Sequence, residues 1–255
     1  MSQHIQNALT FEHVSFQYGQ QNDPTSILKN LTFSVPKGEF VSIVGASGSG
    51  KSTIFRLIVG LEQPNQGDIY LNEQIEKYRL GKVGYMPQQD LLMPWRTIRQ
   101  NAQLVPEIKG ERGDEHVQKL LKQFGLEGYE GKFPHELSGG MRQRVSFLRA
   151  TLSGSDILLL DEPFSALDAM TKLHMQEWLL EQWEKQQSTI LFITHDISEA
   201  LFLSDRIYIV QETPITSLRS IEVPLARPRT RKDLDKKEVI SLKNQLIEQF
   251  RMRMS

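Results

Sequence analysis

The chain has 255 residues, of which 24% are charged and 39% hydrophobic, with a formal net charge of −1 and no cysteine. The near-neutral charge argues against electrostatic binding of nucleic acid, and the lack of cysteine excludes disulfides, thiol catalysis and cysteine-ligated zinc. The polar residues 1–7 lack a signal-peptide core, and no apolar run approaches the roughly 20 residues that span a bilayer. We therefore expect a cytosolic protein that contacts a membrane only through partners.

Apolar and polar side chains alternate over residues 8–35, which predicts antiparallel strands separated by a polar turn at 19–24. Tyr18 ends the first strand, and by itself it is equally well explained as a half-buried surface aromatic. A strand is predicted at 39–44 and a helix at 53–59. The segment between them carries the next motif.

This segment matches G-x-x-x-x-G-K-[ST], the pattern of a phosphate-binding loop. The matching residues are Gly45, Ala46, Ser47, Gly48, Ser49, Gly50, Lys51, Ser52 and Thr53. Glycines let backbone N–H groups approach phosphate oxygens, and the helix N-terminus adds partial positive charge. Lys51 can reach the β- and γ-phosphates, and Ser52 can offer a hydroxyl to Mg²⁺. The alternative, a chance turn rich in glycine and serine, is disfavoured by the strand–loop–helix context.

Short strands are predicted at 67–72 and 83–88, and the character of the sequence changes after them. Residues 89–154 show helical periodicity, as in Val117, Leu120 and Phe124, interrupted by glycines. We interpret this region as a helical subdomain inserted into an α/β core. A helix through about Leu152 is expected to follow the stretch Leu137–Arg144.

The core resumes with a buried strand over residues 157–160, followed by Asp161 and Glu162. A second buried strand, 189–194, is followed by His195, and residues 206–210 are expected to close the sheet. Because parallel strands end at one edge, the carboxylates and the histidine should lie beside the phosphate loop. Asp161 could hold Mg²⁺, Glu162 could act as general base, and His195 could donate to developing charge. The alternatives are a structural acidic pair and a structural histidine.

Two further helices are predicted near the C-terminus. An amphipathic helix over 171–187 carries Leu173, Trp178, Leu179 and Trp183 at helical spacing, and its aromatic side chains are expected in the core. A terminal helix should share one apolar face through Val239, Leu242, Leu246 and Phe250. The basic residues 227–232 between them are interpreted as a solvated linker.

Taken together, these motifs resemble the ATP-binding cassette (ABC) ATPases over about residues 8–215. Leu137-Ser138-Gly139-Gly140 is similar to the family signature L-S-G-G-Q, although Met141 replaces the glutamine of many members. Gln88 resembles the glutamine that joins core and helical subdomain, and Ser165–Asp168 resembles the family's D-loop. His195 is similar to the switch histidine, and Tyr18 to the aromatic residue that stacks on adenine.

The resemblance implies a single α/β domain over 1–255 with a P-loop NTPase core, a mostly parallel sheet and an antiparallel β subdomain. The core would cover about 1–88 and 155–215, the helical subdomain 89–154, and a C-terminal tail with a helix 216–255. Its cofactors would be ATP and Mg²⁺. The catalytic residues it implies are Lys51, Gln88, Glu162 and His195, and the metal ligands are Ser52, Gln88 and Asp161.

The nucleotide would further contact Tyr18, the phosphate loop, Gln88 and Asp168, whereas Ser138, Gly139 and Gly140 would meet the ATP of the opposite subunit. This implies a homodimer in the ATP-bound state. Partners would be transmembrane permease subunits and an extracytoplasmic solute-binding protein, with no nucleic acid, and the location the cytoplasmic face of the membrane. The N-terminal dipole of the signature helix offers an anion site that fits this arrangement.

Three stretches, Leu91–Thr97, Glu162–Ala169 and Pro224–Arg229, are similar to the nitrate/sulfonate/taurine importer branch, which includes importers of pyrimidine precursors. An energy-coupling ATPase subunit for uptake of a small solute is therefore expected. Met93, Pro94 and Trp95 could line a groove for a membrane subunit, or Trp95 could anchor the helical subdomain's own core. The alternative function is a soluble ABC ATPase without a role in transport, but this chain has neither a second cassette nor a long coiled coil. An exporter half and an inactive binding module also fit the motifs less well.

Overall fold

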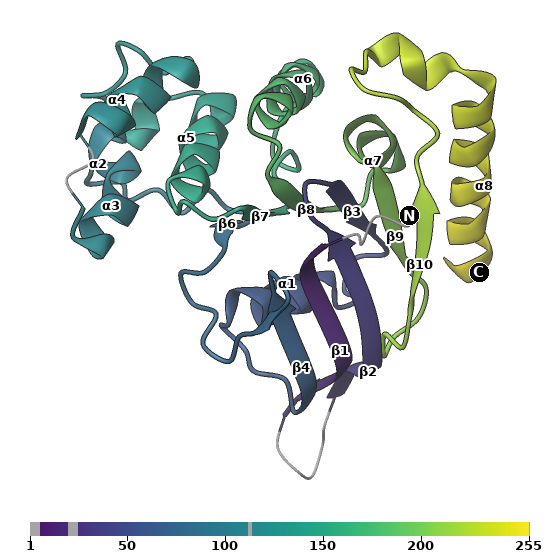
Figure 1. The fold of residues 1–255 in the computed structure, drawn as a ribbon. Helices are drawn as coiled ribbons and strands as arrows, with labels where there is room; N and C mark the ends of the chain where they lie inside the picture. Colours follow the sequence, from purple (N-terminus) through teal and green to yellow (C-terminus); the bar gives the residue numbers. More distant parts are fainter. Residues whose placement is uncertain (1–5, 20–24, 112–113, 255) are drawn as a thin grey trace. The chain divides into compact units, whose positions relative to one another are not determined.

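The computed structural model describes residues 6–19, 25–111 and 114–254, which are drawn in colour in Figure 1. The turn predicted at 19–24 therefore lies outside the described residues, apart from Gly19. The chain divides into two compact units. The first consists of Met1–Leu80 and Leu180–Ser255, and the second of Gly81–Leu179. Helix α6 (Ala169–Gln186) carries the chain from the second unit back into the first.

The first unit contains an antiparallel sheet in the order β2-β1-β4-β5. Its strands are β1 (Asn7–Tyr18), β2 (Thr25–Pro36), β4 (Gln66–Leu71) and β5 (Gln74–Ile75). The buried positions of β1 change from odd to even numbers between Phe11 and Val14, which a regular strand does not allow. The register shifts there and His13 has a φ of 52°, so a β-bulge returns the apolar side chains to the core face. The predicted antiparallel strands are confirmed.

A second set of strands in the first unit ends at the phosphate loop and at His195. β3 (Phe40–Val44) lies between β8 (Thr189–Thr194) and β9 (Arg206–Val210) and runs parallel to both. Every residue of β3 and β8 is buried, as expected for strands covered on both faces. β10 (Leu218–Glu222) pairs antiparallel with β9, so the prediction that residues 206–210 close the sheet is wrong. β10 is mostly exposed and lacks the apolar alternation from which a strand can be predicted, so it was not expected.

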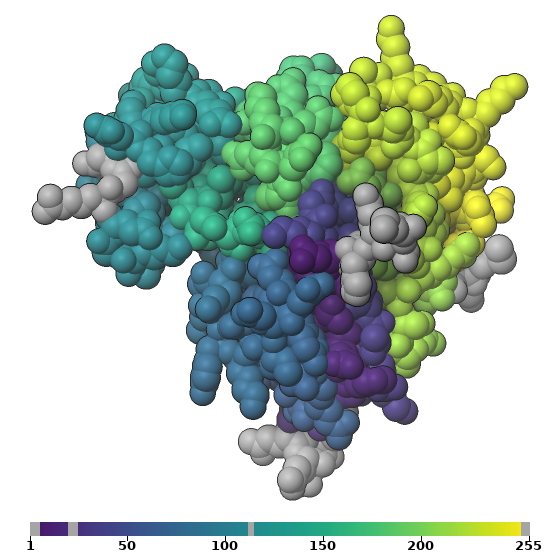
Figure 2. Space-filling view, viewed as in Figure 1, coloured from purple at the N-terminus to yellow at the C-terminus, as the bar shows by residue number. Residues whose placement is uncertain are grey.

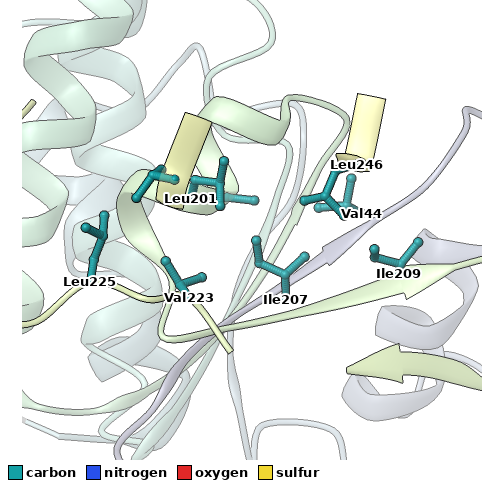
Figure 3. Packing of buried hydrophobic residues seen from close by; sticks show 9 residues of the cluster. Val44, Leu201, Ile207, Ile209, Val223, Leu225 and Leu246 are labelled. Atoms are coloured by element: carbon teal, nitrogen blue, oxygen red, sulfur yellow. The ribbon is translucent and has the colours of Figure 1, made fainter. Parts of the chain in front are cut away.

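Helices α1 (Lys51–Val59), α7 (Ile197–Leu203) and α8 (Lys237–Met254) belong to the first unit, with the short 3-10 helix η2 (Arg231–Asp235). The apolar face predicted for the terminal helix is confirmed, because Val239 and Leu246 are each only 1% exposed. Leu246 joins a cluster with Leu201, Ile207 and Val44, the last residue of β3 (Figure 3). Helix α8 is therefore part of the core that supports the phosphate loop.

The basic segment 227–232 is fastened to the first unit, which corrects the expectation of a solvated linker. Arg229 is buried and donates hydrogen bonds to the main-chain oxygen at the C-cap of α7 (2.6 Å) and to the carboxylate of Asp205 (3.2 Å). Arg227 also binds Asp205 (2.9 Å), and its guanidinium lies 4.3 Å from the centre of the Trp183 ring. Burial lowers the pKa of Arg229 to about 10. A run of basic residues is therefore exposed to solvent only where no carboxylate or carbonyl oxygen of the fold binds it.

In the second unit, strands β6 (Gly84–Met86) and β7 (Ile157–Asp161) run parallel. Its helices are α2 (Ile98–Ala102), α3 (Leu104–Lys109), α4 (Asp114–Gln123), η1 (Pro134–Glu136), α5 (Gly139–Thr151) and the first part of α6. The teal side chains of α2, α3 and α4 form one continuous body in the space-filling view (Figure 2). None of the helices in the described part of the chain combines the length and the apolarity that a membrane crossing requires.

The aromatic core of the second unit consists of Phe124, Phe147 and Trp178, whose ring centres lie 5.0–5.7 Å apart. The tryptophans of α6 are core residues as expected, because Trp178 packs in this cluster and Trp183 is only 7% exposed, whereas Leu173 is 39% exposed. Residues advance by about 100° each around a helix, so Leu173 and Trp178, five positions apart, cannot share one narrow face.

Candidate functional site

The phosphate loop connects β3 to α1, as predicted, and α1 begins at Lys51, two residues earlier than expected. Gly48 and Gly50 have φ values of 76° and 93°, in the left-handed region that glycine tolerates. A Cβ atom on Gly50 would lie 2.6 Å from the Cγ2 atom of Ile27, so no larger residue fits there. The glycines of the motif are therefore required by this backbone even before any ligand is considered.

The ammonium group of Lys51 is folded into this loop. The residue is 5% exposed, and its Nζ donates to the carbonyl oxygens of Gly45 (2.9 Å) and Ala46 (2.7 Å). No acidic residue lies in the first turn of α1, so its N-terminal N–H groups and dipole face the loop without a competing carboxylate in that turn. Cation, helix end and loop together form a site for an anion with several oxygens.

The structure brings His195 to the same loop. Strands β3 and β8 are parallel with Val44 opposite Thr194, so the loop and His195 leave the same edge of the sheet. His195, Gly45, Ala46 and Ser49 line a cavity of about 350 Å³, which is also bordered by side chains of β9 and α8. The predicted proximity of the histidine and the phosphate loop is therefore found within the first unit.

The backbone on either side of His195 is held by a network that the sequence analysis missed. Thr194 Oγ1 accepts a hydrogen bond from Asp196 N (3.0 Å) and donates to the buried carboxylate of Glu199. Asp196 in turn caps α7 by accepting from the N–H groups of Ser198 (2.8 Å) and Glu199 (3.3 Å). An Asp followed three residues later by Glu is an N-capping pattern, and it could have revealed this helix start.

Tyr18 is half-buried at the end of β1. Its ring meets that of Phe16 edge-on, with centres 4.8 Å apart. Tyr18 pairs with Thr25 of β2, two residues before Ile27, which lies against Gly50. The aromatic ring thus belongs to the strand pair that borders the phosphate loop, which is compatible with both interpretations given for it.

The second unit brings together two other predicted residues, Gln88 and Glu162. Because β6 and β7 are parallel with Met86 opposite Leu160, the residues that follow both strands are neighbours. Gln88 Nε2 donates to Glu162 Oε2 at 3.3 Å. Asp161 is 6% exposed at the end of β7, and Glu162 has a left-handed φ of 45°.

The predicted signature segment starts α5. Ser138 is its N-cap residue, and its Oγ accepts a hydrogen bond from Met141 N (3.3 Å). A Cβ atom on Gly140 would lie 2.8 Å from Thr171 Cγ2, so the second glycine is needed for contact with α6. The first turn of α5 contains no acidic residue. The 13-residue helix therefore presents an N-terminus suited to an anion, as the motif predicted.

Asp168 has a structural task that the sequence analysis did not foresee. Its Oδ1 accepts hydrogen bonds from the N–H groups of Met170 (3.2 Å) and Thr171 (3.1 Å) at the start of α6. The hydrogen bond from the Thr171 side chain is the largest of the interactions that lower the pKa of this carboxyl group. Asp168 is thus a helix cap held in its charged form, whatever else it contacts.

The family model described as ABC transporter matches residues 28–165. The chain belongs to the ABC transporter family. One relative, the formylaminopyrimidine import ATP-binding protein ThiZ of Halalkalibacterium halodurans, is 48% identical over 86% of each chain. An aliphatic sulfonates import ATP-binding protein, SsuB of Bacillus cereus, is 36% identical over 95% of each chain.

Solved structures agree with this family. The dimeric cassette MJ0796, in a post-hydrolysis state bound to ADP and Pi, is 30% identical with a TM-score of 0.72 and covers 86% of this chain and 100% of its own. CbiO1 of Clostridium perfringens, at 23% identity and a TM-score of 0.75, shows the same fold over 94% of this chain. The predicted α/β fold of an ABC ATPase, its binding and hydrolysis of ATP, and the resemblance to the importer branch are confirmed.

Proposed function

We propose that this ABC ATPase is the energy-coupling subunit of an importer that takes up a small solute through separate membrane subunits. The observation that carries the proposal is the 48% identity to a formylaminopyrimidine import protein over 86% of both chains. Two aliphatic sulfonate import proteins are 44% identical over 84% and 36% identical over 95% of both chains. A pyrimidine precursor is therefore the first solute class proposed, and a sulfonate, taurine or nitrate-like anion is the second.

ATP would be held first by the phosphate loop of the first unit. Backbone N–H groups of residues 45–53 and the start of α1 would bind its phosphate oxygens, and Lys51 would shift from the loop carbonyls to the β- and γ-phosphates. Tyr18, at the end of the bordering strand pair, would stack on the adenine ring.

The oxygen donors of this chain suit Mg²⁺ bound together with ATP. No three His, Asp or Glu side chains of the described residues are gathered as a metal site, but such an ion needs only one or two protein oxygens beside phosphate and water. Ser52 would supply a hydroxyl, Gln88 an amide oxygen, and Asp161, 6% exposed at a strand end, a carboxylate. The ion would neutralise charge on the β- and γ-phosphates.

Hydrolysis would use Glu162, which we assign as the general base for the attacking water. Its contact with Gln88 at 3.3 Å places an amide donor beside the carboxylate, where it can orient water. His195 would donate to charge that develops on the γ-phosphate, from a backbone pinned by Thr194 and the cap of α7.

A homodimer in the ATP-bound state would complete each site. The N-terminus of α5 would present Ser138, Gly139 and Gly140 to the γ-phosphate bound by the other subunit, and Asp168 would lie at the same interface. A chain with one phosphate loop and one signature segment needs a second copy for this contact.

Contact with a permease would be made by the loop after Gln88. Trp95 is 72% exposed, which argues against a role in the local core, whereas its neighbour Leu92 is buried. An exposed tryptophan is a frequent anchor of protein interfaces. The permease would hold this chain at the cytoplasmic face of the membrane, and an extracytoplasmic binding protein would deliver the solute.

The proposal is tested by uptake into vesicles that contain this chain assembled with candidate permease subunits and a candidate solute-binding protein. ATP inside the vesicles should drive accumulation of a labelled formylaminopyrimidine, and replacing Glu162 by Gln should abolish it. Uptake of an alkanesulfonate instead would shift the solute class. A folded, ATP-hydrolysing chain that binds no permease and supports no uptake would favour the soluble, non-transport function.

A further inference from the structure

The loop that carries Gln88 is fastened to the signature helix α5 by two arginines. Arg142 Nε lies 3.1 Å from Asp90 Oδ2, and Arg149 donates to the main-chain oxygens of Asp90 (2.7 Å) and Leu91 (2.9 Å). Arg142 and Arg149 are seven positions apart, two helical turns, and therefore lie on the same face of α5. One face of the signature helix thus grips two consecutive residues of this loop.

These contacts are more than a loose surface ion pair. The side chains of Arg142 and Asp90 are 36% and 29% exposed, and burial lowers the pKa of Arg149 while the charge of Asp90 opposes that shift. Leu91 has a left-handed φ of 46°, a conformation that a leucine seldom adopts and that surrounding contacts must hold. Arg149 binds the carbonyl oxygens of Asp90 and Leu91, which lie on either side of the N–Cα bond of Leu91.

We call Arg142 and Arg149, with their contacts to Asp90 and Leu91, the arginine clamp. A predicted site residue lies at each end of it. Arg142 also donates to the carbonyl oxygen of Leu137 (2.8 Å), directly before the Ser138 N-cap of α5. At the other end Gln88, two residues before Asp90, reaches Glu162 at 3.3 Å. A short chain of polar contacts within the second unit therefore runs from the start of the signature helix to Glu162.

We propose that Asp90, Arg142 and Arg149 are positioning residues that make the Gln88 loop and α5 move as one body during ATP hydrolysis. The proposal rests on the function proposed above for Gln88, Glu162 and the signature segment. A shift of Gln88 would be transmitted through the arginines to the N-terminus of α5, which is proposed to contact the ATP of the other subunit. A shift of this N-terminus would equally move Gln88. None of these residues needs to touch the nucleotide for this effect.

The test uses the full chain and compares Asp90→Asn, Arg142→Gln and the double variant in steady-state ATP hydrolysis. Asp90→Asn keeps the oxygen that accepts from Leu92 N (3.1 Å) but removes the charge and replaces the oxygen that accepts from Arg142 by an NH₂ group. We expect kcat to fall about tenfold in each single variant while the KM for ATP stays within about twofold, because the phosphate loop lies in the other unit. Asp90→Glu should restore most of the rate.

The double variant should be no slower than the slower single variant, because the same contact is lost in all three. Glu127→Gln is the matched control: Glu127 forms an exposed ion pair with Lys122 at 3.1 Å in the same unit, and its loss should leave kcat unchanged. The proposal is overturned if kcat is unchanged in both single variants, if their losses multiply, or if they merely follow a lowered melting temperature. Glu162→Gln, measured alongside, tests the catalytic assignment separately.

Discussion

Two carbonyl oxygens of the phosphate loop hold the ammonium of Lys51, at 2.7 and 2.9 Å. Only glycine, alanine and serine stand between Val44 and this lysine, so no bulky side chain separates the charge from an incoming phosphate. A lysine is a flexible point charge, able to leave carbonyl partners for a stronger anionic one. At the scale of a residue, nucleotide affinity should therefore depend strongly on this single cation.

Replacing Lys51 by Ala should weaken ATP binding roughly 10- to 100-fold, since a hydrogen bond to a charged group contributes about 1.5–3 kcal/mol. Titration with ATP at fixed Mg²⁺, followed by calorimetry, measures this loss. Lys29→Ala removes an exposed lysine of the same unit and serves as the control. Equal affinity of the Lys51 variant and the control would refute the assignment.

Motif spacing led to the proposals for Lys51, Glu162 and His195, which stand after predicted strands that the structure contains, whereas the proposal for Gln88 came from the family resemblance. It did not reveal the arginine clamp. An arginine that binds main-chain carbonyls leaves no pattern of its own in a sequence, since every residue carries a carbonyl. The left-handed φ of Glu162 was equally invisible, because it is set by the packing around the end of β7.

At the scale of elements, charged side chains fix where helices begin. In η2, the N–H and hydroxyl groups of Thr230 donate to Asp233 Oδ2 at 2.7 and 2.9 Å, and Lys236 pairs with Oδ1 at 2.9 Å. The hydrogen bond from Lys236 is the main cause that lowers the pKa of Asp233 from 3.8 to about 2. This capped helix, η2, connects the arginine-rich segment 227–232 to the start of α8.

The Asp233 cap should lose its effect in acid. Because the folded pKa is about 2 and the ordinary value 3.8, the ionised carboxylate stabilises the fold above pH 3.8, and this stabilisation disappears as the pH falls towards 2. Asp233→Asn should therefore lower the melting temperature at pH 7, and the difference from the natural chain should vanish near the lower value. Thermal melts across that pH range measure it; a difference independent of pH would contradict the cap.

Helix α8 offers a second prediction for an element. Leu246 is 1% exposed in the cluster with Val44, so Leu246→Ala should cost about 2–5 kcal/mol of stability. A fall in melting temperature of roughly 5–15 °C is expected for a chain of this size. Ile240→Ala, at a position 44% exposed on the same helix, should change little. Similar melts for the two variants would show that α8 is not part of the core.

Most elements were foreseen because apolar periodicity follows directly from burial. The misses share a cause: their partners are distant in sequence. β10 depends on the free edge of β9, and the burial of Arg229 depends on Asp205 and the end of α7. The β-bulge at His13 was hidden in an alternation that looked merely imperfect. Local patterns carry no information about such long-range pairings.

At the scale of the whole molecule, the residues assigned to ATP chemistry are divided between two units. The phosphate loop and His195 belong to the first unit, whereas Gln88, Glu162 and the signature segment belong to the second. Dimerisation through ATP would add the signature segment of another copy. Association should therefore require the γ-phosphate and should be strongest when hydrolysis is blocked.

The Glu162→Gln chain should accordingly be a dimer with ATP and a monomer with ADP. Light scattering after size-exclusion chromatography gives the mass in both states. Combining it with Lys51→Ala, which weakens ATP binding, should strongly reduce the ATP-dependent dimer at the same ATP concentration. Equal masses with ATP and ADP, at a protein concentration of about 100 μM, would count against an ATP-bridged pair.

The position of β3 in the chain has a consequence for synthesis on the ribosome. At the start of β3, Gly38 N donates a hydrogen bond to Thr189 and Phe40 N donates one to Asp205. These partners lie 151 and 165 residues further along the chain. At about 5–20 residues per second, β3 waits about 8–30 s for these partners. During that time the apolar strand that leads into the phosphate loop stays without its neighbours β8 and β9. We expect the nascent chain to need a chaperone until residue 205 has emerged.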